Sequence, residues 1–181
     1  SSDSLAQAVT EVESVLGDSL VCKGDFEISL SRHISNVLQD RGLTLAVAES
    51  CTGGLVSSLV VENDGASSVF RGGVVAYHND SKEIFLGLHG EVLSRTGAVS
   101  KDTALEMARN VRLRSGSDFG LSITGVAGPG GGSEDKPVGT IWLGISSRDG
   151  SEQAASYKLP FDRNFNRQYA AALSLDSLRR L

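Results

Sequence analysis

Residues 43–61 read LTLAVAESCTGGLVSSLVV, and this stretch decides the fold. One apolar run ends at Ala48, a turn of small polar residues and paired glycines follows, and a second apolar run begins at Leu55. The pattern predicts a strand, a tight turn and a helix. Because the first turn of a helix carries free N–H groups and a partial positive charge, we expect the turn to hold a reactive or anion-binding group.

Strand and helix patterns alternate along the rest of the chain. We expect helices at 4–16, 26–40, 83–86, about 101–114 and from 163 onward, and strands at 43–48, 72–77, 119–126, 138–146 and 152–159. Ser100 is the expected N-cap of the helix at about 101–114. The last helix is expected to turn Tyr169, Leu173 and Leu178 inward. Alternating elements with one late hairpin around 148–151 predict a three-layer α/β/α sandwich with a mixed sheet.

Composition excludes several classes of protein. A chain of 181 residues is expected to form mainly one domain. The net charge of −5 argues against a nucleic-acid partner. No apolar run approaches the roughly 20 residues of a membrane span, and the first residues lack the features of a signal peptide. Two cysteines form no disulfide framework, so we expect a reduced, cytoplasmic setting.

The chain lacks an initiator Met, so we expect it to be processed or cut from something longer, with residues 1–25 as a lead-in segment. The three histidines have no metal-ligand spacing, and we expect no metal and no cofactor. Dimers are common among compact α/β domains, so a homo-oligomer, such as a dimer, is expected.

Three segments at the ends of predicted strands are rich in small or polar groups: 49–54, 77–82 and 124–133. Ligands of open α/β sheets collect at the carboxyl ends of the strands. We therefore expect the three segments to meet in one crevice.

Ser50 is a candidate nucleophile, and it would need a base. No histidine follows a triad pattern, so Lys82 and Tyr77 are the better candidates, as in serine–lysine variants of the triad. Lys82 could act as a base only with a lowered pKa. The alternative is that Ser50 merely caps the next helix and Lys82 is a solvated surface lysine. Residue types alone favour that alternative.

Other candidates are less specific. Cys51 is a rival nucleophile beside a helix N-terminus, or else a small buried residue. The loop 128–132 matches neither a P-loop nor a dinucleotide fingerprint. Arg163 and Arg167, four residues apart, could clamp a phosphate or be ordinary solvated arginines.

Five motifs occur in a fixed order: AESCTGG at 48–54, VAY at 75–77 with Lys82, GAVS at 97–100, TGVAGP at 124–129 and KPVGT at 136–140. In this order they resemble the C-terminal domain of the competence/damage-inducible CinA family, which is also found alone as nicotinamide mononucleotide amidohydrolase. The resemblance covers roughly residues 26–178. The sequence departs from the family pattern at Asn110 and Phe161, where glycine is common.

The resemblance implies an α/β/α domain at 26–181 that hydrolyses the carboxamide of nicotinamide mononucleotide to nicotinic acid mononucleotide and ammonia. It implies that residues 1–25 join this domain to an upstream domain acting on ADP-ribose-like pyrophosphates. The family's proposed arrangement, likened to that of serine β-lactamases, implies catalytic roles for Ser50, Tyr77 and Lys82. The residues expected at the substrate are Thr52, Gly53, Gly54, Thr124, Gly125, Gly128 and Arg163. Two alternatives stay open, a non-catalytic nucleotide-binding or regulatory module and an amidase for another small carboxamide.

Overall fold

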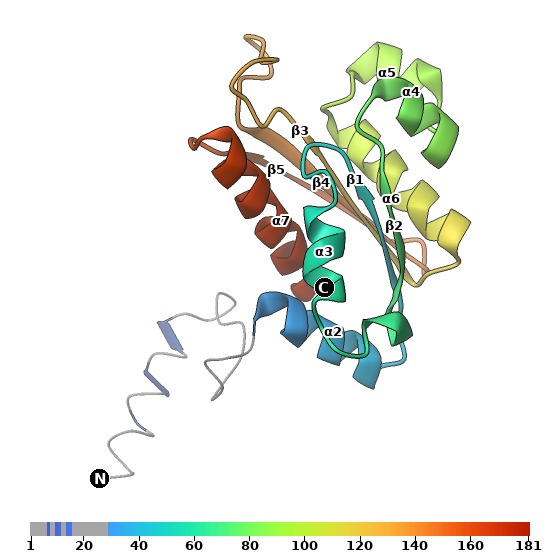
Figure 1. The fold of residues 1–181 in the computed structure, drawn as a ribbon, viewed down its shortest axis with the longest axis vertical. Coiled ribbons are helices and arrows are strands. Elements are labelled where there is room, and N and C mark those ends of the chain that lie inside the picture. Colours follow the sequence, from blue (N-terminus) through green and yellow to red (C-terminus); the bar gives the residue numbers. More distant parts are fainter. Residues whose placement is uncertain (1–6, 8–9, 12–13, 16–28) are drawn as a thin grey trace.

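A computed structural model describes residues 29–181, together with residues 7, 10, 11, 14 and 15 (Figure 1). The helix expected at 4–16 therefore lies largely outside the described residues, as do residues 26–28 of the next expected helix. That helix is described from Leu30, and the hydroxyl of its N-cap, Ser29, accepts a hydrogen bond from the N–H of Arg32.

All five expected strands are confirmed, with small shifts at their ends. In chain order the elements are α2 (Leu30–Asp40), β1 (Leu45–Glu49), α3 (Leu55–Val61), η2 (Ala66–Ser68), β2 (Phe70–Val75), α4 (Asn79–Ser81), η3 (Lys82–Leu86), α5 (Gly90–Thr96), α6 (Lys101–Ser115), β3 (Phe119–Gly125), β4 (Thr140–Ser147), β5 (Glu152–Lys158) and α7 (Arg163–Arg179). The short helices η2 and α5 were not expected. Residues 82–86 form a π-helical turn rather than an α-helix. Ser100 caps α6 as expected.

The five strands form one mixed sheet in the order β2-β1-β3-β4-β5. β1 runs parallel to both β2 and β3, whereas β4 and β5 are added antiparallel, and β4 and β5 form the expected hairpin. The chain moves from β1 to β2 on one side and later returns to β3 on the other. β1 and β3 therefore mark the point at which the winding reverses, where open sheets of this kind bind ligands.

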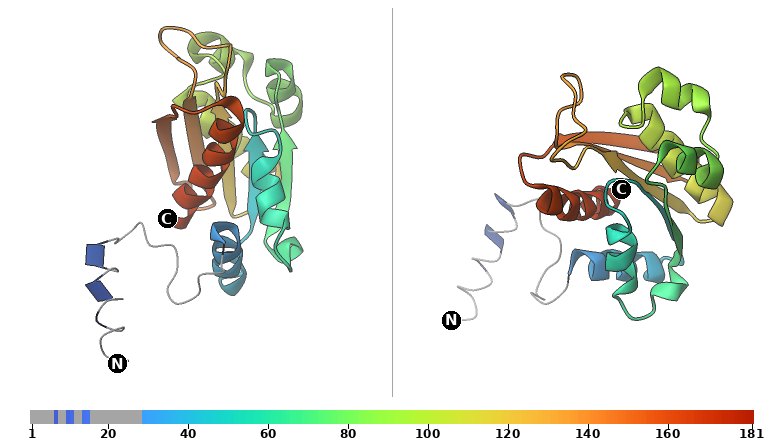
Figure 2. Two further views of the ribbon diagram at one scale, coloured as in Figure 1. Left: turned by 60° about the vertical axis from the view of Figure 1, so that its left-hand side comes forward. Right: turned by 45° about the horizontal axis from the view of Figure 1, so that its top comes forward.

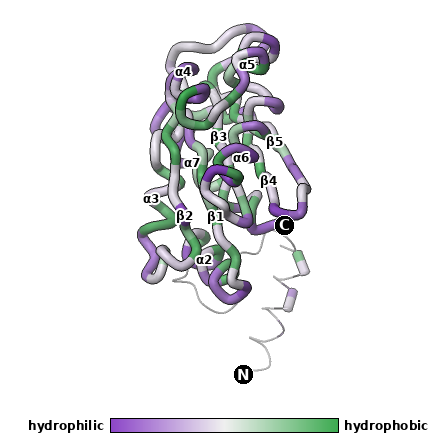
Figure 3. The backbone as a smooth tube through the Cα atoms, turned by 90° about the vertical axis from the view of Figure 1, so that its right-hand side faces the viewer, coloured by the Kyte–Doolittle hydropathy of each residue, from purple (hydrophilic) through white to green (hydrophobic). Residues whose placement is uncertain are grey.

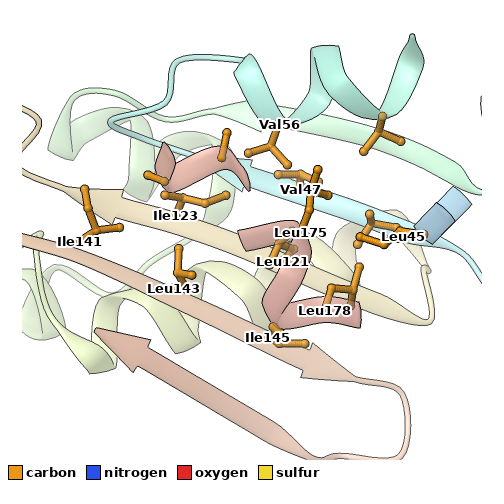
Figure 4. Close-up of a cluster of buried hydrophobic side chains, with 14 of the residues drawn as sticks. Leu45, Val47, Val56, Leu121, Ile123, Ile141, Leu143, Ile145, Leu175 and Leu178 are labelled. Atoms are coloured by element: carbon orange, nitrogen blue, oxygen red, sulfur yellow. The ribbon is translucent and has the colours of Figure 1, made fainter. Parts of the chain in front are cut away.

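Helices cover both faces of the sheet, which confirms the three-layer α/β/α sandwich (Figures 1 and 2). α2, α3 and α7 cover one face, over a core that includes Val47, Leu121, Ile123 and Leu175 (Figure 4). α6 and η3 cover the other face, over a smaller core. Coloured by hydropathy, α2 and α3 alternate apolar and polar segments, as expected of helices with one buried face (Figure 3).

The inward position expected for Tyr169 is wrong. α7 packs on the sheet through Ala170, Ala171, Leu175 and Leu178, at the spacing of one helix face. Tyr169 falls outside that face and is 44% exposed.

α6 lies so close to β3 that only glycine fits at position 120. A Cβ atom on Gly120 of β3 would lie 2.0 Å from the carbonyl oxygen of Ala108 in α6. We expect Gly120→Ala to lower the free energy of unfolding by about 1–3 kcal/mol, because the helix must move away from the strand. Urea unfolding measures this loss. Gly130→Ala, where a Cβ would meet nothing within 4 Å, is the control and should change little. Equal stability of the two variants would contradict the expectation.

Candidate active site

The carboxyl ends of β1, β2 and β3 lie at the same edge of the sheet and open into a cavity of about 270 Å³. All three segments expected to meet there contribute to it. Its lining residues are Ser50, Cys51, Tyr77, Asn79, Lys82, Ala98, Val99, Thr124, Gly125, Val126, Ala127, Gly128, Gly130, Gly131 and Arg163.

Ser50 and Lys82 are in direct contact at this cavity. Lys82 Nζ donates a hydrogen bond to Ser50 Oγ over 3.2 Å. The N–H of Ser50 donates to the carbonyl of Ile123, which fixes the serine between β1 and β3. Ser50 does not cap α3, because the N-cap residue of that helix is Gly54, and the N–H groups at its start donate to the side chain of Glu49 rather than to Ser50. The capping interpretation of Ser50 is therefore wrong.

Lys82 is not a surface lysine, because only 1% of it is exposed. Its other Nζ hydrogen bonds go to the carbonyls of Ala76, at 3.0 Å, and Tyr77, at 3.4 Å. Among the residues that the structure describes, no carboxylate pairs with this amine. Burial without a counter-charge lowers the pKa of Lys82 below its ordinary value, which favours the neutral amine that a base requires.

Cys51 is a poor nucleophile in this position. It is 5% exposed and packs in the core beneath α3 and α7. Burial raises the pKa of its thiol to about 12, so the thiolate is absent near neutral pH.

The N-terminus of α3 is already occupied, which corrects the expectation of free N–H groups there. The buried carboxylate of Glu49 accepts hydrogen bonds from the backbone N–H groups of Gly54, Val56 and Ser57. It also accepts from the hydroxyls of Thr52 and Ser57, both at 2.7 Å. Sequence reasoning missed this role, since an acidic residue near a helix N-terminus is compatible with it but an outside anion could occupy the same position.

Glu49 should therefore be needed for the turn that carries Ser50. We expect Glu49→Gln to lower the free energy of unfolding by about 2–4 kcal/mol, since an amide NH₂ would face N–H donors that cannot turn away. Thermal or urea unfolding measures the loss. Glu62→Gln is the matched control, because Glu62 is the exposed C-cap of the same helix. A Glu49→Gln protein as stable as the control would show that the five hydrogen bonds contribute little.

Thr52, Gly53 and Gly54, expected at the substrate, do not line the cavity. Thr52 is fully buried, with its hydroxyl bonded to Glu49. Gly53 and Gly54 both have positive φ, which glycine adopts without strain, so they shape the turn. The carbonyl of Thr52 accepts a hydrogen bond from Arg167, at 2.9 Å, so this arginine of α7 stabilises the same turn.

Tyr77 lines the cavity, but its hydroxyl does not contact the serine–lysine pair. Arg163 Nη2 donates to Tyr77 Oη over 2.8 Å, and Arg163 Nη1 donates to the carbonyl of Gly128 over 2.6 Å. Lys82 contacts the backbone carbonyl of Tyr77 instead. Arg163 thus joins the loop after β3 to the loop after β2.

Ala98 and Val99 also line the cavity, although neither was among the expected site residues. Ala98 and Val99 precede α6, and the hydroxyl of Thr124 donates to the carbonyl of Ala98 over 2.7 Å. Ala98 and Val99 both belong to the motif at 97–100. The methyl group of Ala98 and the isopropyl group of Val99 carry no reactive atom, so the sequence gives no signal of their place at the site.

Within the described part of the chain, no helix is both long and apolar enough to cross a membrane. No three His, Cys, Asp or Glu side chains of that part gather in an arrangement that could hold a metal ion.

Comparison with known proteins agrees with this architecture. A CinA-like protein of Geobacter sulfurreducens is 43% identical over 97% of this chain, which spans only 42% of that relative. The chain thus covers about two fifths of the curated relatives it matches. The crystal structure of a competence/damage-inducible protein from Agrobacterium tumefaciens superposes with a TM-score of 0.81 at 39% identity, over 83% of this chain and 92% of that one. A CinA superfamily structure from Escherichia coli gives 0.79 at 26% identity, over 92% and 98% of the two chains. The family model for the CinA C-terminal domain matches residues 27–181, and the chain belongs to this family.

Proposed function

We propose that this domain hydrolyses the carboxamide of nicotinamide mononucleotide, with Ser50 as the nucleophile and Lys82 as its base. The observation that carries the proposal is the contact of Lys82 Nζ with Ser50 Oγ, made by a buried amine without a carboxylate partner among the described residues. A hydroxyl beside a neutral amine is the arrangement that activates a weak nucleophile.

In the first half of the reaction, Ser50 Oγ attacks the carboxamide carbon while Lys82 takes the hydroxyl proton. The tetrahedral intermediate collapses, and the Lys82 ammonium returns this proton to the departing nitrogen, which leaves as ammonia. In the second half, Lys82 takes a proton from a water that attacks the ester, and this proton then returns to Ser50 Oγ. One lysine serves as base and acid in turn.

The oxyanion needs a donor beside Ser50. Ser50's own N–H is bound to Ile123, but the N–H of Cys51 donates to no other residue in the described part of the chain. Cys51 also lines the cavity, and the residue after the nucleophile supplies an oxyanion donor in other serine hydrolases. We assign the oxyanion contact to this N–H group.

Arg163 is the proposed contact for the substrate phosphate. Its guanidinium lies at the cavity and bonds only to neutral oxygens, those of Gly128 and Tyr77, within the described residues. An arginine without a carboxylate partner can bind a phosphate through two parallel hydrogen bonds. Tyr77 accordingly serves on the phosphate side of the cavity, and the proton transfer is assigned to Lys82 alone.

Ammonia release from nicotinamide mononucleotide by the 181-residue chain tests the proposal. A panel of carboxamides, including free nicotinamide and asparagine, measures its specificity. Release from the mononucleotide above all others supports the proposal. Binding of the mononucleotide without turnover would instead indicate a non-catalytic nucleotide-binding module.

The phosphate contact has its own test. We expect Arg163→Met to raise KM for the mononucleotide about tenfold or more, since a charge-assisted pair is lost, and to leave KM for nicotinamide riboside unchanged. Steady-state kinetics on both substrates measure the difference. Arg95→Met, at an exposed arginine on α5, is the control. An equal effect of Arg163→Met on both substrates would place the phosphate elsewhere.

A further inference from the structure

A second cavity adjoins the first and is lined by neither Ser50 nor Lys82. It has a volume of about 510 Å³ and is lined by Ala127, Gly128, Pro129, Val138, Phe161, Asp162, Arg163 and Asn164. Ala127, Gly128 and Arg163 line both cavities. The hydrogen bond from Arg163 to the carbonyl of Gly128 therefore lies where the two cavities meet.

The second cavity has an aromatic wall. Phe161 packs edge-on against Phe165, with ring centroids 4.7 Å apart, and against Tyr169 at 5.8 Å. The ring packs against these two neighbours, yet 44% of Phe161 stays exposed. Pro129 and Val138 add apolar surface to a lining that also includes the polar residues at the start of α7. A half-exposed ring beside apolar side chains suits a flat aromatic group that stacks on it.

The charge at the junction indicates what would connect the two cavities. Arg163 has no carboxylate partner among the described residues, and its nitrogens bond to the neutral oxygens of Gly128 and Tyr77. The carboxylate of the neighbouring Asp162 is turned to the N–H of Phe165, at 2.9 Å. An anionic linker passing between the cavities would therefore meet an unpaired cation.

We propose that the second cavity binds the second base of a dinucleotide, with its pyrophosphate at Arg163 and its nicotinamide half in the Ser50 cavity. Placing the nicotinamide in the Ser50 cavity rests on the proposed function. The base site at Phe161 is argued separately, from the second cavity. The substrate class is accordingly extended from the mononucleotide to pyridine dinucleotides. Stacking of a base on an aromatic side chain supplies the added affinity.

Equilibrium binding to the full chain carrying Ser50→Ala tests this, with nicotinamide adenine dinucleotide, nicotinamide mononucleotide and adenosine monophosphate as probes. We expect the dinucleotide to bind about tenfold more tightly than the mononucleotide. Phe161→Leu should remove that advantage and weaken adenosine monophosphate, while mononucleotide binding is unchanged. Phe161→Tyr keeps the ring and should retain the advantage. Phe85→Leu, at an exposed phenylalanine of η3 that lines neither cavity, is the matched control.

The outcomes separate the two proposals. The base site is overturned if the dinucleotide binds no more tightly than the mononucleotide, or if Phe161→Leu weakens all three probes alike. Adenosine monophosphate binding that depends on Phe161, together with no ammonia release from any carboxamide, would support the base site and reject the amidase. Ammonia release without Phe161-dependent binding would support the amidase and reject the base site.

Discussion

Replacing Ser50 by alanine should reduce ammonia release from nicotinamide mononucleotide by about 10⁴-fold or more, with little change in the free energy of unfolding. Removal of a catalytic serine costs this much in other hydrolases, because no covalent intermediate can form. The fold should tolerate the change, since the Ser50 hydroxyl accepts only from Lys82 within the described residues, while the backbone N–H that fixes the turn is retained. Single-turnover and steady-state assays on the purified variant measure the loss.

Cys51→Ala is the matched control for this prediction, because it removes the rival nucleophile next to Ser50 in the same turn. Its thiol is buried and protonated, so we expect kcat to stay within a few-fold of the parent protein. A modest loss of stability should accompany it, since the side chain packs in the core. Full activity in Ser50→Ala together with a dead Cys51→Ala would overturn the assignment of the nucleophile.

How far the sequence predicts this site depends on which physical property each residue uses. Strand ends were predictable from hydrophobic runs bounded by glycine and polar residues, and this placed Ser50, Tyr77 and Thr124 near one edge of the sheet. The side-chain contacts at this edge were not predictable. The N-terminus of α3, for example, could bind either an outside anion or the chain's own Glu49. Only the folded backbone shows that Glu49 occupies it.

The same limit explains Lys82 and Tyr77. A lysine after a polar helix start is most often solvated, and nothing local to 79–86 indicates that a π-helical turn begins at residue 82, or that this side chain is buried. Tyr77 was expected beside the serine and lysine, but its hydroxyl pairs with Arg163, 86 positions further along the chain. Contacts between such distant segments depend on packing rather than on local propensity.

We expect Lys82→Arg to lower kcat by about 10²–10⁴-fold. Arginine keeps the positive charge but cannot lose its proton, so it can bond to Ser50 without acting as a base. Lys101→Arg, at an exposed lysine of α6, is the control and should be unaffected. An active Lys82→Arg enzyme would exclude lysine as the base.

The pH profile tests the same residue without mutating it. The reaction needs the neutral amine, so kcat/KM should rise with pH as Lys82 deprotonates, with a midpoint below the ordinary lysine value of 10.5 because burial lowers the pKa. The stability of the folded protein should also rise with pH. Between the lowered pKa and 10.5 the unfolded chain binds more protons than the folded one, so the free energy of unfolding rises with pH. Lys82→Met removes the titrating group, so this rise, measured by urea unfolding against the parent protein, should disappear. If the parent and Lys82→Met show the same pH dependence, Lys82 does not titrate in that window, and its assignment as the base fails.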